Sequence, residues 1–153
     1  MSSVFDPNTF GSMTFTGSNS TESVPHPVGE HLFTITKQEI TAWQGKKDTS
    51  KSGLKCTLAL ESVDPDGSIK AVTGREKNNL RYEMMLDLTP EGGLDMGKGM
   101  NVRLGRAREA CNINDPSRPF AFDMFIGHQV KGMVSHETYK NQLVANVDSV
   151  AKA

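Results

Sequence analysis

The chain has 153 residues, the size of one globular domain with a hydrophobic core of its own. Its formal net charge is −1, so it is not a polycation that binds nucleic acid through bulk charge. Hydrophobic residues make up only 36% of the chain, and part of this deficit lies in a polar N-terminal segment.

Cysteine usage indicates a reducing compartment, and hydropathy indicates a protein without a membrane span. Cys56 and Cys111 lie far apart and belong to no paired motif, so we expect two buried free thiols. No apolar run approaches the roughly 18 residues of a membrane span. The N-terminus also lacks the basic and apolar regions of a secretory signal. The sequence therefore predicts a cytoplasmic protein with no membrane partner.

Residues 1–27 are rich in Ser, Thr, Asn and Gly and show no helical or strand period. This composition predicts an N-terminal arm, flexible or laid along the body, that precedes a folded domain of residues 28–150. Phe5, Phe10 and Phe15 recur at five-residue steps, which fits neither regular element. We expect them to dock onto the domain or onto a neighbouring subunit rather than to stay free, which predicts a homo-oligomer held through the arm.

Strand patterns begin at Val28. Apolar and polar residues alternate in GEHLFTITKQEI, GLKCTLALESV and LRYEMMLDL, which predicts three strands. In the first, His31, Phe33, Ile35 and Lys37 are expected on one face. The DPDG stretch before the third strand predicts a turn, and SIKAV after it suggests a short extra strand.

The period then changes to that of a helix. An apolar stripe at i, i+4, i+7 and i+11 consists of Met100, Leu104, Ala107 and Cys111. Asn112 or Asn114 can end this helix, and Pro116 bars its continuation. PFAFDMFIG suggests a short helical turn. HQVKGMVSH and NQLVANVDSV predict two final strands, joined as a hairpin around residues 137–140.

Residue patterns of enzymes and metal sites are missing. The chain contains no GxSxG, HExxH or phosphate-loop motif. Its four histidines lack the spacing of a zinc site, and DPDG lacks the further oxygen ligands of a calcium loop. We therefore expect no enzymatic activity, no metal and no cofactor.

Two connections combine aromatic and basic residues, as single-strand nucleic-acid binders do. The stretch AWQGKKDTSKSGLK supplies Trp43, Lys46, Lys47, Lys51 and Lys55, and the last connection supplies His136, Tyr139 and Lys140. Arg81 and Lys131 on the predicted strands complete the expected nucleic-acid-binding set. The alternative is that the lysines are simply solvated and that Trp43 packs in the core.

The positions of these connections predict a fold. Five strands with one main helix between the third and the fourth match an OB-like Greek-key barrel in the all-β class. Barrels of this type bind oligonucleotides through the connections between strands 1 and 2 and between strands 4 and 5. Those are the two connections enriched here.

Five stretches also carry a family resemblance. They are a Gly-led strand at 29–35, KSGLKCTLALESV, RLGRAREACNI, a Gly-x-x-Val-x-Gly strand at 126–132, and a closing strand at 143–147. With this pattern, residues 28–147 resemble the single-stranded DNA-binding proteins encoded by tailed bacteriophages. The chain departs from that group in its long neutral arm and in its C-terminus, where Asp148 and Lys152 cancel. This puts recruitment of partners by an acidic tail in doubt.

The resemblance implies binding of single-stranded DNA with little sequence specificity, in phage DNA replication or recombination. It also implies the host-cell cytoplasm as the location, and phage replication or recombination proteins as partners. The alternative is a non-enzymatic structural or interaction protein of a phage, such as a virion or scaffold component. The arm and the near-zero net charge favour that alternative.

Overall fold

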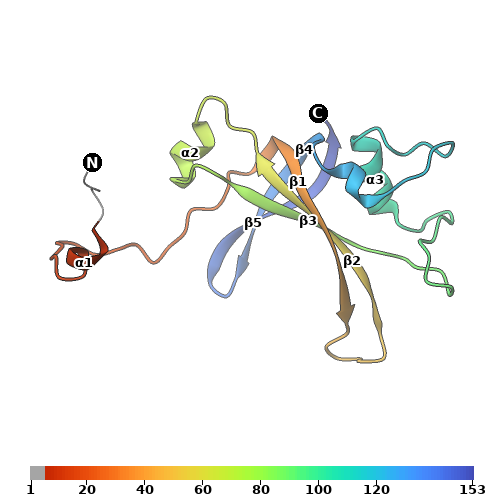
Figure 1. Cartoon of the computed structure of the whole chain (residues 1–153), viewed down its shortest axis with the longest axis horizontal. Helices are drawn as coiled ribbons and strands as arrows, with labels where there is room; N and C mark the ends of the chain where they lie inside the picture. The colour runs from red at the N-terminus through yellow and green to blue at the C-terminus, as the bar shows by residue number, and fades with distance from the viewer. Residues whose placement is uncertain (1–5) are drawn as a thin grey trace.

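The fold is described by a computed structural model in which residues 6–153 are placed. Its elements are α1 (Pro7–Phe10), β1 (Gly29–Gln44), β2 (Ser52–Ser62), α2 (Ser68–Thr73), β3 (Asn79–Met85), α3 (Val102–Ala110), the 3-10 helix η1 (Phe122–Phe125), β4 (Gln129–Tyr139) and β5 (Gln142–Lys152). The five strands form one antiparallel sheet in the order β3-β2-β1-β4-β5 (Figure 1). The predicted β-rich fold with few helices is therefore confirmed.

A β-bulge changes which residues of β1 face the core. The register to β2 shifts between Ile35 and Lys37, so that Ile35 pairs with Leu60 but Lys37 pairs with Ala59. An extra residue in one strand turns the following side chains to the opposite face. The expectation that Lys37 shares a face with Phe33 and Ile35 is therefore wrong, and Lys37 is exposed.

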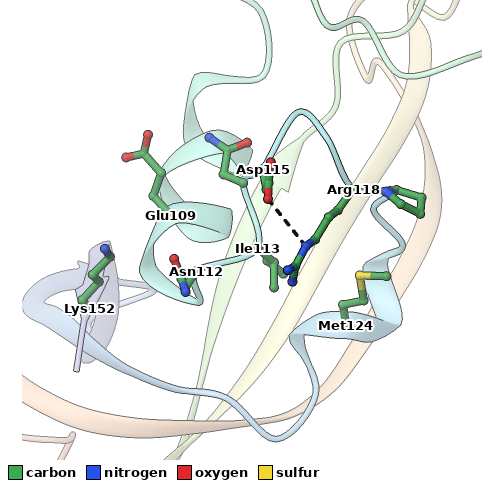
Figure 2. Close-up of a pocket in the computed structure, with 9 residues that line it drawn as sticks. Glu109, Asn112, Ile113, Asp115, Arg118, Met124 and Lys152 are labelled. Carbon is green, nitrogen blue, oxygen red and sulfur yellow. Dashed lines mark ion pairs between the residues drawn. The ribbon is translucent and has the colours of Figure 1, made fainter.

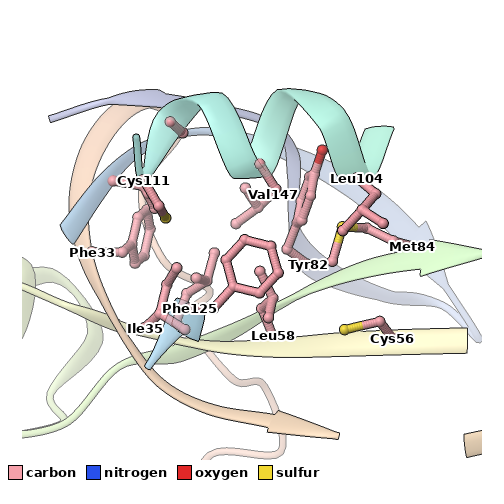
Figure 3. Packing of buried hydrophobic residues seen from close by; sticks show 14 of the residues in the cluster. Phe33, Ile35, Cys56, Leu58, Tyr82, Met84, Leu104, Cys111, Phe125 and Val147 are labelled. Carbon is pink, nitrogen blue, oxygen red and sulfur yellow. The ribbon is translucent and has the colours of Figure 1, made fainter. Parts of the chain in front are cut away.

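The core lies between the inner face of the sheet and α3 (Figure 3). The alternation predicted for the second and third strands is confirmed, because Cys56, Leu58 and Leu60 on β2 and Tyr82 and Met84 on β3 are all buried. Helix α3 covers them with Leu104 and Ala107, Cys111 adds to the cluster directly after the helix, and η1 adds Phe125. Burying one such large side chain contributes about 1.5–3 kcal/mol, so this cluster holds the sheet and the helix together.

The sheet is open between its edge strands, β3 and β5. No backbone ladder joins these two strands within residues 6–153, so the predicted barrel closure is not confirmed. Arg103 of α3 spans the opening. Its Nε donates to the carbonyl of Glu83 on β3 at 2.8 Å, and its Nη1 donates to the carbonyl of Asp148 on β5 at 2.9 Å.

The segment SIKAV forms α2 and not the extra strand that the sequence suggested. The carboxylate of Asp64 explains the difference, since it accepts the N–H groups of Ile69 at 3.0 Å and Lys70 at 2.9 Å. These are N–H groups of the first helical turn, which have no partner inside a helix. Gly67 and Gly74 bracket α2 with left-handed backbone, at φ of 73° and 76°.

Helix α3 is shorter than its predicted stripe. Met100 lies before its first turn and is exposed, because Asn101 adopts a left-handed φ of 51°. The Asn101 side chain ties this turn to the end of β3 by donating to the carbonyls of Asp87 and Asp95. Asn112 has a φ of 58°, which confirms it as the residue that follows the helix end.

The arm leaves the body and extends away from the sheet (Figure 1). Residues 6–24 are exposed, whereas His26 is buried against Phe33, with 5.4 Å between the two ring centroids. Phe5 lies outside the described residues. At the other terminus, β5 continues to Lys152.

Cys56 and Cys111 are buried free thiols, as predicted. Burial raises the pKa of each thiol to about 11, so both stay protonated and unreactive near neutral pH. Within residues 6–153, none of the helices has the length and apolar character needed to cross a membrane.

Candidate nucleic-acid interface

The sequence predicted Trp43 in the connection between the first two strands, but the residue lies within β1. It pairs with Gly53 of β2, and its indole ring lies over that residue. A Cβ at position 53 would come within 2.9 Å of the indole Nε1, so Gly53 is what allows the ring to lie there. The indole N–H is buried with no hydrogen-bond partner among the described residues, while the side chain as a whole is only half-buried.

The turn between β1 and β2 presents three lysines to solvent. Gly45 donates to the carbonyl of Lys51 at 2.8 Å, which closes the turn. The acid of this turn, Asp48, accepts hydrogen bonds from the backbone and the hydroxyl of Ser50, and these bonds lower the pKa of its carboxyl. In the part of the chain that the structure describes, no carboxylate lies within ion-pair distance of Lys46, Lys47 or Lys51. The tip of this hairpin is therefore basic.

Lys55 and Arg81 lie further along, on the outer faces of β2 and β3. Lys55 is not free, because its Nζ lies 3.6 Å from a carboxylate oxygen of Glu83. Arg81 pairs with Ala59 and its side chain is exposed. This outer face carries both signs of charge, whereas the hairpin tip carries three exposed lysines and one acid, Asp48.

The sequence predicted the turn of the last hairpin around residues 137–140, but the β4–β5 hairpin turns at Lys140 and Asn141. Both residues have left-handed backbone, with φ of 50° and 63°, which matches the two-residue turn that strand twist favours. Tyr139 is therefore the last residue of β4, and its side chain is 60% exposed. The Lys140 ammonium lies 5.4 Å from the centroid of the Tyr139 ring, within the range of a cation–π contact.

A groove follows the opening between β3 and β5, with a volume of about 830 Å³. It is lined by Arg81, Glu83, Arg103, Glu137, Tyr139 and Asp148, among others. Both hairpins project to the same side of the molecule, which is the lower side in Figure 1. Arg81 of β3 and Tyr139 at the tip of the second hairpin therefore line the same groove.

Two of the residues expected at the interface lie elsewhere. Lys131 pairs with Leu32 near the start of β1, whereas Trp43 lies at its end, and the Lys131 Nζ is 3.7 Å from Glu30. His136 is half-buried, and its Nε2 donates to the backbone carbonyl of His26 at 2.7 Å. His136 therefore holds the root of the arm.

The sequence reasoning missed Arg103. Its guanidinium stacks 3.9 Å from the centroid of the Tyr82 ring and lines the groove while it bridges the two edge strands. Burial raises the pKa of the Tyr82 hydroxyl, while the nearby positive charge of Arg103 acts in the opposite direction. No local sequence signal marks Arg103, because its role depends on the approach of strands far away in the chain.

A second hollow, of about 620 Å³, lies beside the C-terminal end of α3 (Figure 2). Glu109, Asp115, Arg118 and Lys152 line it, and the Arg118 Nε lies 3.6 Å from Asp115. It contains none of the predicted site residues. Residues 6–153 also contain no group of three or more His, Cys, Asp or Glu side chains placed to hold a metal ion.

The candidate interface therefore consists of a basic hairpin tip with Trp43, a second hairpin tip with Tyr139 and Lys140, and the groove that Arg81 and Arg103 line. No model of a known protein family matches this chain, and no curated protein is significantly similar to it.

Proposed function

We propose that the protein binds single-stranded DNA with little sequence preference. The observation that carries this proposal is the tip of the β1–β2 hairpin, where Lys46, Lys47 and Lys51 extend into solvent beside the half-buried Trp43. The exposed Tyr139 and its neighbouring Lys140 lie on the same side of the molecule.

The chemistry of single strands fits this combination. Every base has a flat face that stacks on an aromatic ring, and one such stack contributes about 1–3 kcal/mol without regard to sequence. Lysines beside the ring follow the phosphates. Because the strand faces carry charges of both signs, the electrostatic contribution to the affinity for single strands is modest, which agrees with a net charge of −1.

The proposal includes an OB-type barrel. The strand order and the antiparallel ladders support it, because β3 and β5 are the two edges that must approach for the sheet to close. Arg103 contacts both edges through the carbonyls of Glu83 and Asp148. In this arrangement the two hairpins flank the face on which barrels of this type bind oligonucleotides.

The biological setting that we propose is the replication or recombination of phage DNA in the cytoplasm of the host cell. The resemblance of residues 28–147 to phage single-stranded DNA-binding proteins supports this setting. The protein would protect or organise single strands without catalysing a reaction, and phage replication or recombination proteins are the expected partners.

The binding proposal is tested by fluorescence anisotropy of labelled oligo-dT at moderate salt. We expect binding that unlabelled oligo-dT and mixed-sequence single strands compete away equally, and that duplex DNA competes away poorly. Oligo-rU of equal length tests the choice between DNA and RNA. Competition by duplex DNA as strong as by single strands would contradict the proposal, because a duplex leaves no base faces open for stacking.

The second candidate is a structural or interaction component of a phage. The exposed Phe10 and Phe15 of the arm favour it, since large apolar side chains in solvent are typical of a surface that meets another protein. No binding to any of the oligonucleotides would favour this candidate.

A further inference from the structure

The end of the β4–β5 hairpin projects from the sheet as a two-stranded ribbon. The ladder between β1 and β4 ends where Gly29 pairs with Val134, and from Ser135 to Tyr139 the described ladder partners of β4 all lie on β5. We call residues 135–146 the ribbon. A two-stranded hairpin by itself is only marginally stable in water, so the direction of the ribbon depends on contacts at its base and along its sides.

The base of the ribbon is tied to the buried end of the N-terminal arm. The His136 Nε2 lies 2.7 Å from the backbone carbonyl of His26, and because a carbonyl only accepts, this nitrogen carries the proton. His26 is itself 1% exposed, shares a hydrogen bond of 3.0 Å with Ser62 of β2, and packs its ring 5.4 Å from that of Phe33. His136 therefore connects the ribbon through His26 to the hydrophobic core.

The tip of the ribbon lies beside the same part of the arm. Three arm residues and three ribbon residues line a common hollow of about 300 Å³, namely Glu22, Ser23, Pro25, Asn141, Gln142 and Leu143. The Arg75 guanidinium, from the segment between α2 and β3, donates to the carbonyl of Val24 at 3.1 Å. We call residues 22–26 the arm root. The arm root thus flanks the ribbon and is fixed to the body at Val24 and at His26.

The opposite face of the ribbon lines the groove between β3 and β5. Successive side chains of a strand point to opposite faces, so Glu137 and Tyr139 point away from the face of His136. Both of them line the groove, together with Arg81 of β3. His136 therefore meets the arm root on one face of the ribbon, while Tyr139 presents its exposed ring on the other. A change in the direction of the ribbon would move Tyr139 relative to Arg81 and alter the width of the groove.

We propose that His136 is a positioning residue, which holds the ribbon through the arm root in the direction at which Tyr139 stacks on a base of a single strand in the groove. This role differs from the direct contact with nucleic acid that the sequence predicted for His136, and it agrees with a half-buried side chain. The arm root then contributes to binding without touching the strand. The inference rests on the proposed function, but the hold of the arm root on the ribbon is measurable without DNA.

Amide hydrogen exchange of the free protein tests this hold, and anisotropy with labelled oligo-dT tests its consequence. In His136→Ala the amides of residues 135–146 should exchange about 5-fold faster or more, because a hydrogen bond at the base of the ribbon is lost, while the β1–β2 hairpin keeps its rates. Binding should weaken about 5-fold or more, since one stack is worth about 5-fold to about 140-fold in affinity. The slope of log K against log salt concentration should stay unchanged, because no phosphate contact is removed. His136→Gln keeps an N–H donor at a similar reach and should restore both the exchange rates and the affinity.

Tyr139→Ala decides whether His136 acts through that ring. In the Tyr139→Ala background, adding His136→Ala should change the affinity by less than about 2-fold, whereas two independent losses would multiply. His128→Ala is the matched control and should exchange and bind like the wild type, because His128 is also half-buried but precedes the other end of β4. If His136→Ala does not fold, Arg75→Ala replaces an exposed side chain, releases Val24 and should have the same effects.

Two results would overturn the proposal. One is a ribbon that exchanges at the wild-type rate in His136→Ala, and the other is a full further loss of affinity when His136→Ala is added to Tyr139→Ala. A wild type that binds no oligo-dT would instead refute the proposed function, and with it the part of His136 in binding, even where exchange shows that the arm root holds the ribbon.

Discussion

Replacing Lys46 and Lys47 by alanine is expected to make single-stranded DNA binding less sensitive to salt. Both side chains are exposed at the tip of the β1–β2 hairpin, so their removal leaves no cavity and no buried group without a partner. The only acid in this turn, Asp48, is hydrogen-bonded to Ser50 and, among the described residues, forms no ion pair with either lysine. The variant should therefore fold with an unchanged melting temperature.

The magnitude follows from counterion release. Each phosphate contact on a single strand contributes about −0.7 to the slope of log K against log salt concentration. Contacts by Lys46, Lys47 and Lys51 give a slope of about −2, and removal of two of them makes it shallower by about 1.4. Between about 50 and about 200 mM salt, binding should weaken about 18-fold for the wild type and about 3-fold for the variant.

The assay is a series of anisotropy titrations with labelled oligo-dT at four or more salt concentrations. Lys98→Ala is the matched control, because Lys98 is also exposed and has no ion-pair partner in the described part of the chain, but lies in the loop before α3. Its slope should equal that of the wild type. If the Lys46 and Lys47 variant keeps the wild-type slope, these lysines do not contact phosphates and the proposed site is wrong.

Three further predictions concern the second hairpin, the arm and the histidine at its root. Tyr139→Ala should lose about 1–3 kcal/mol of oligo-dT binding, because a stacking platform is removed, with no change in melting temperature since the side chain is 60% exposed. Deletion of residues 1–24 should keep a cooperative denaturant transition while lowering the mass in light scattering, and failure to fold would show that the arm belongs to the domain core. Burial lowers the pKa of His26 below 6.5, so the unfolded chain takes up a proton more readily, and stability should fall as the pH drops from 6.5 towards the folded pKa. Urea unfolding between about pH 5 and about pH 7.5 checks this, and a His26→Gln variant with undiminished pH dependence would contradict it.

The sequence predicted those strands and helices that bury only one face, because their apolar residues then recur with the period of the element. Leu58 and Leu60 on β2 alternate with half-exposed neighbours because only one face of that strand meets the core. Leu104 and Ala107 mark α3 for the same reason, at helical spacing. Residue patterns carry this information because burial on one face is a local property of a regular element.

Features that depend on distant segments were not predictable in this way. The bulge at residues 35–37 fits β1 to β2 and leaves no mark in the composition of β1. Helix α2 is a local exception, because Asp64, which accepts the N–H groups of its first turn, lies in the adjacent DPDG stretch, where the sequence indicated only a turn. Arg103 became part of the groove only because β3 and β5 approach each other beneath α3.

For the residues of the candidate site, too, exposure was predictable where it depends on the local sequence and not where it depends on strand pairing. Lys46, Lys47 and Lys51 remain exposed at a turn, as their surroundings in the sequence predicted. Lys55 and Lys131 instead meet Glu83 and Glu30, which strand pairing brings beside them from elsewhere in the chain. Pairing across strands is set by register, which a single strand's sequence does not reveal.

The most direct test of the account is the intrinsic fluorescence of Trp43, the only tryptophan in the chain, during titration with oligo-dT. Base stacking on the indole should quench its emission to saturation. The apparent affinity should weaken between low and moderate salt with the slope of about −2 that three lysine contacts give. An emission that stays constant at low salt, while anisotropy shows the oligonucleotide bound, would place the bound strand away from Trp43 and contradict the proposed interface.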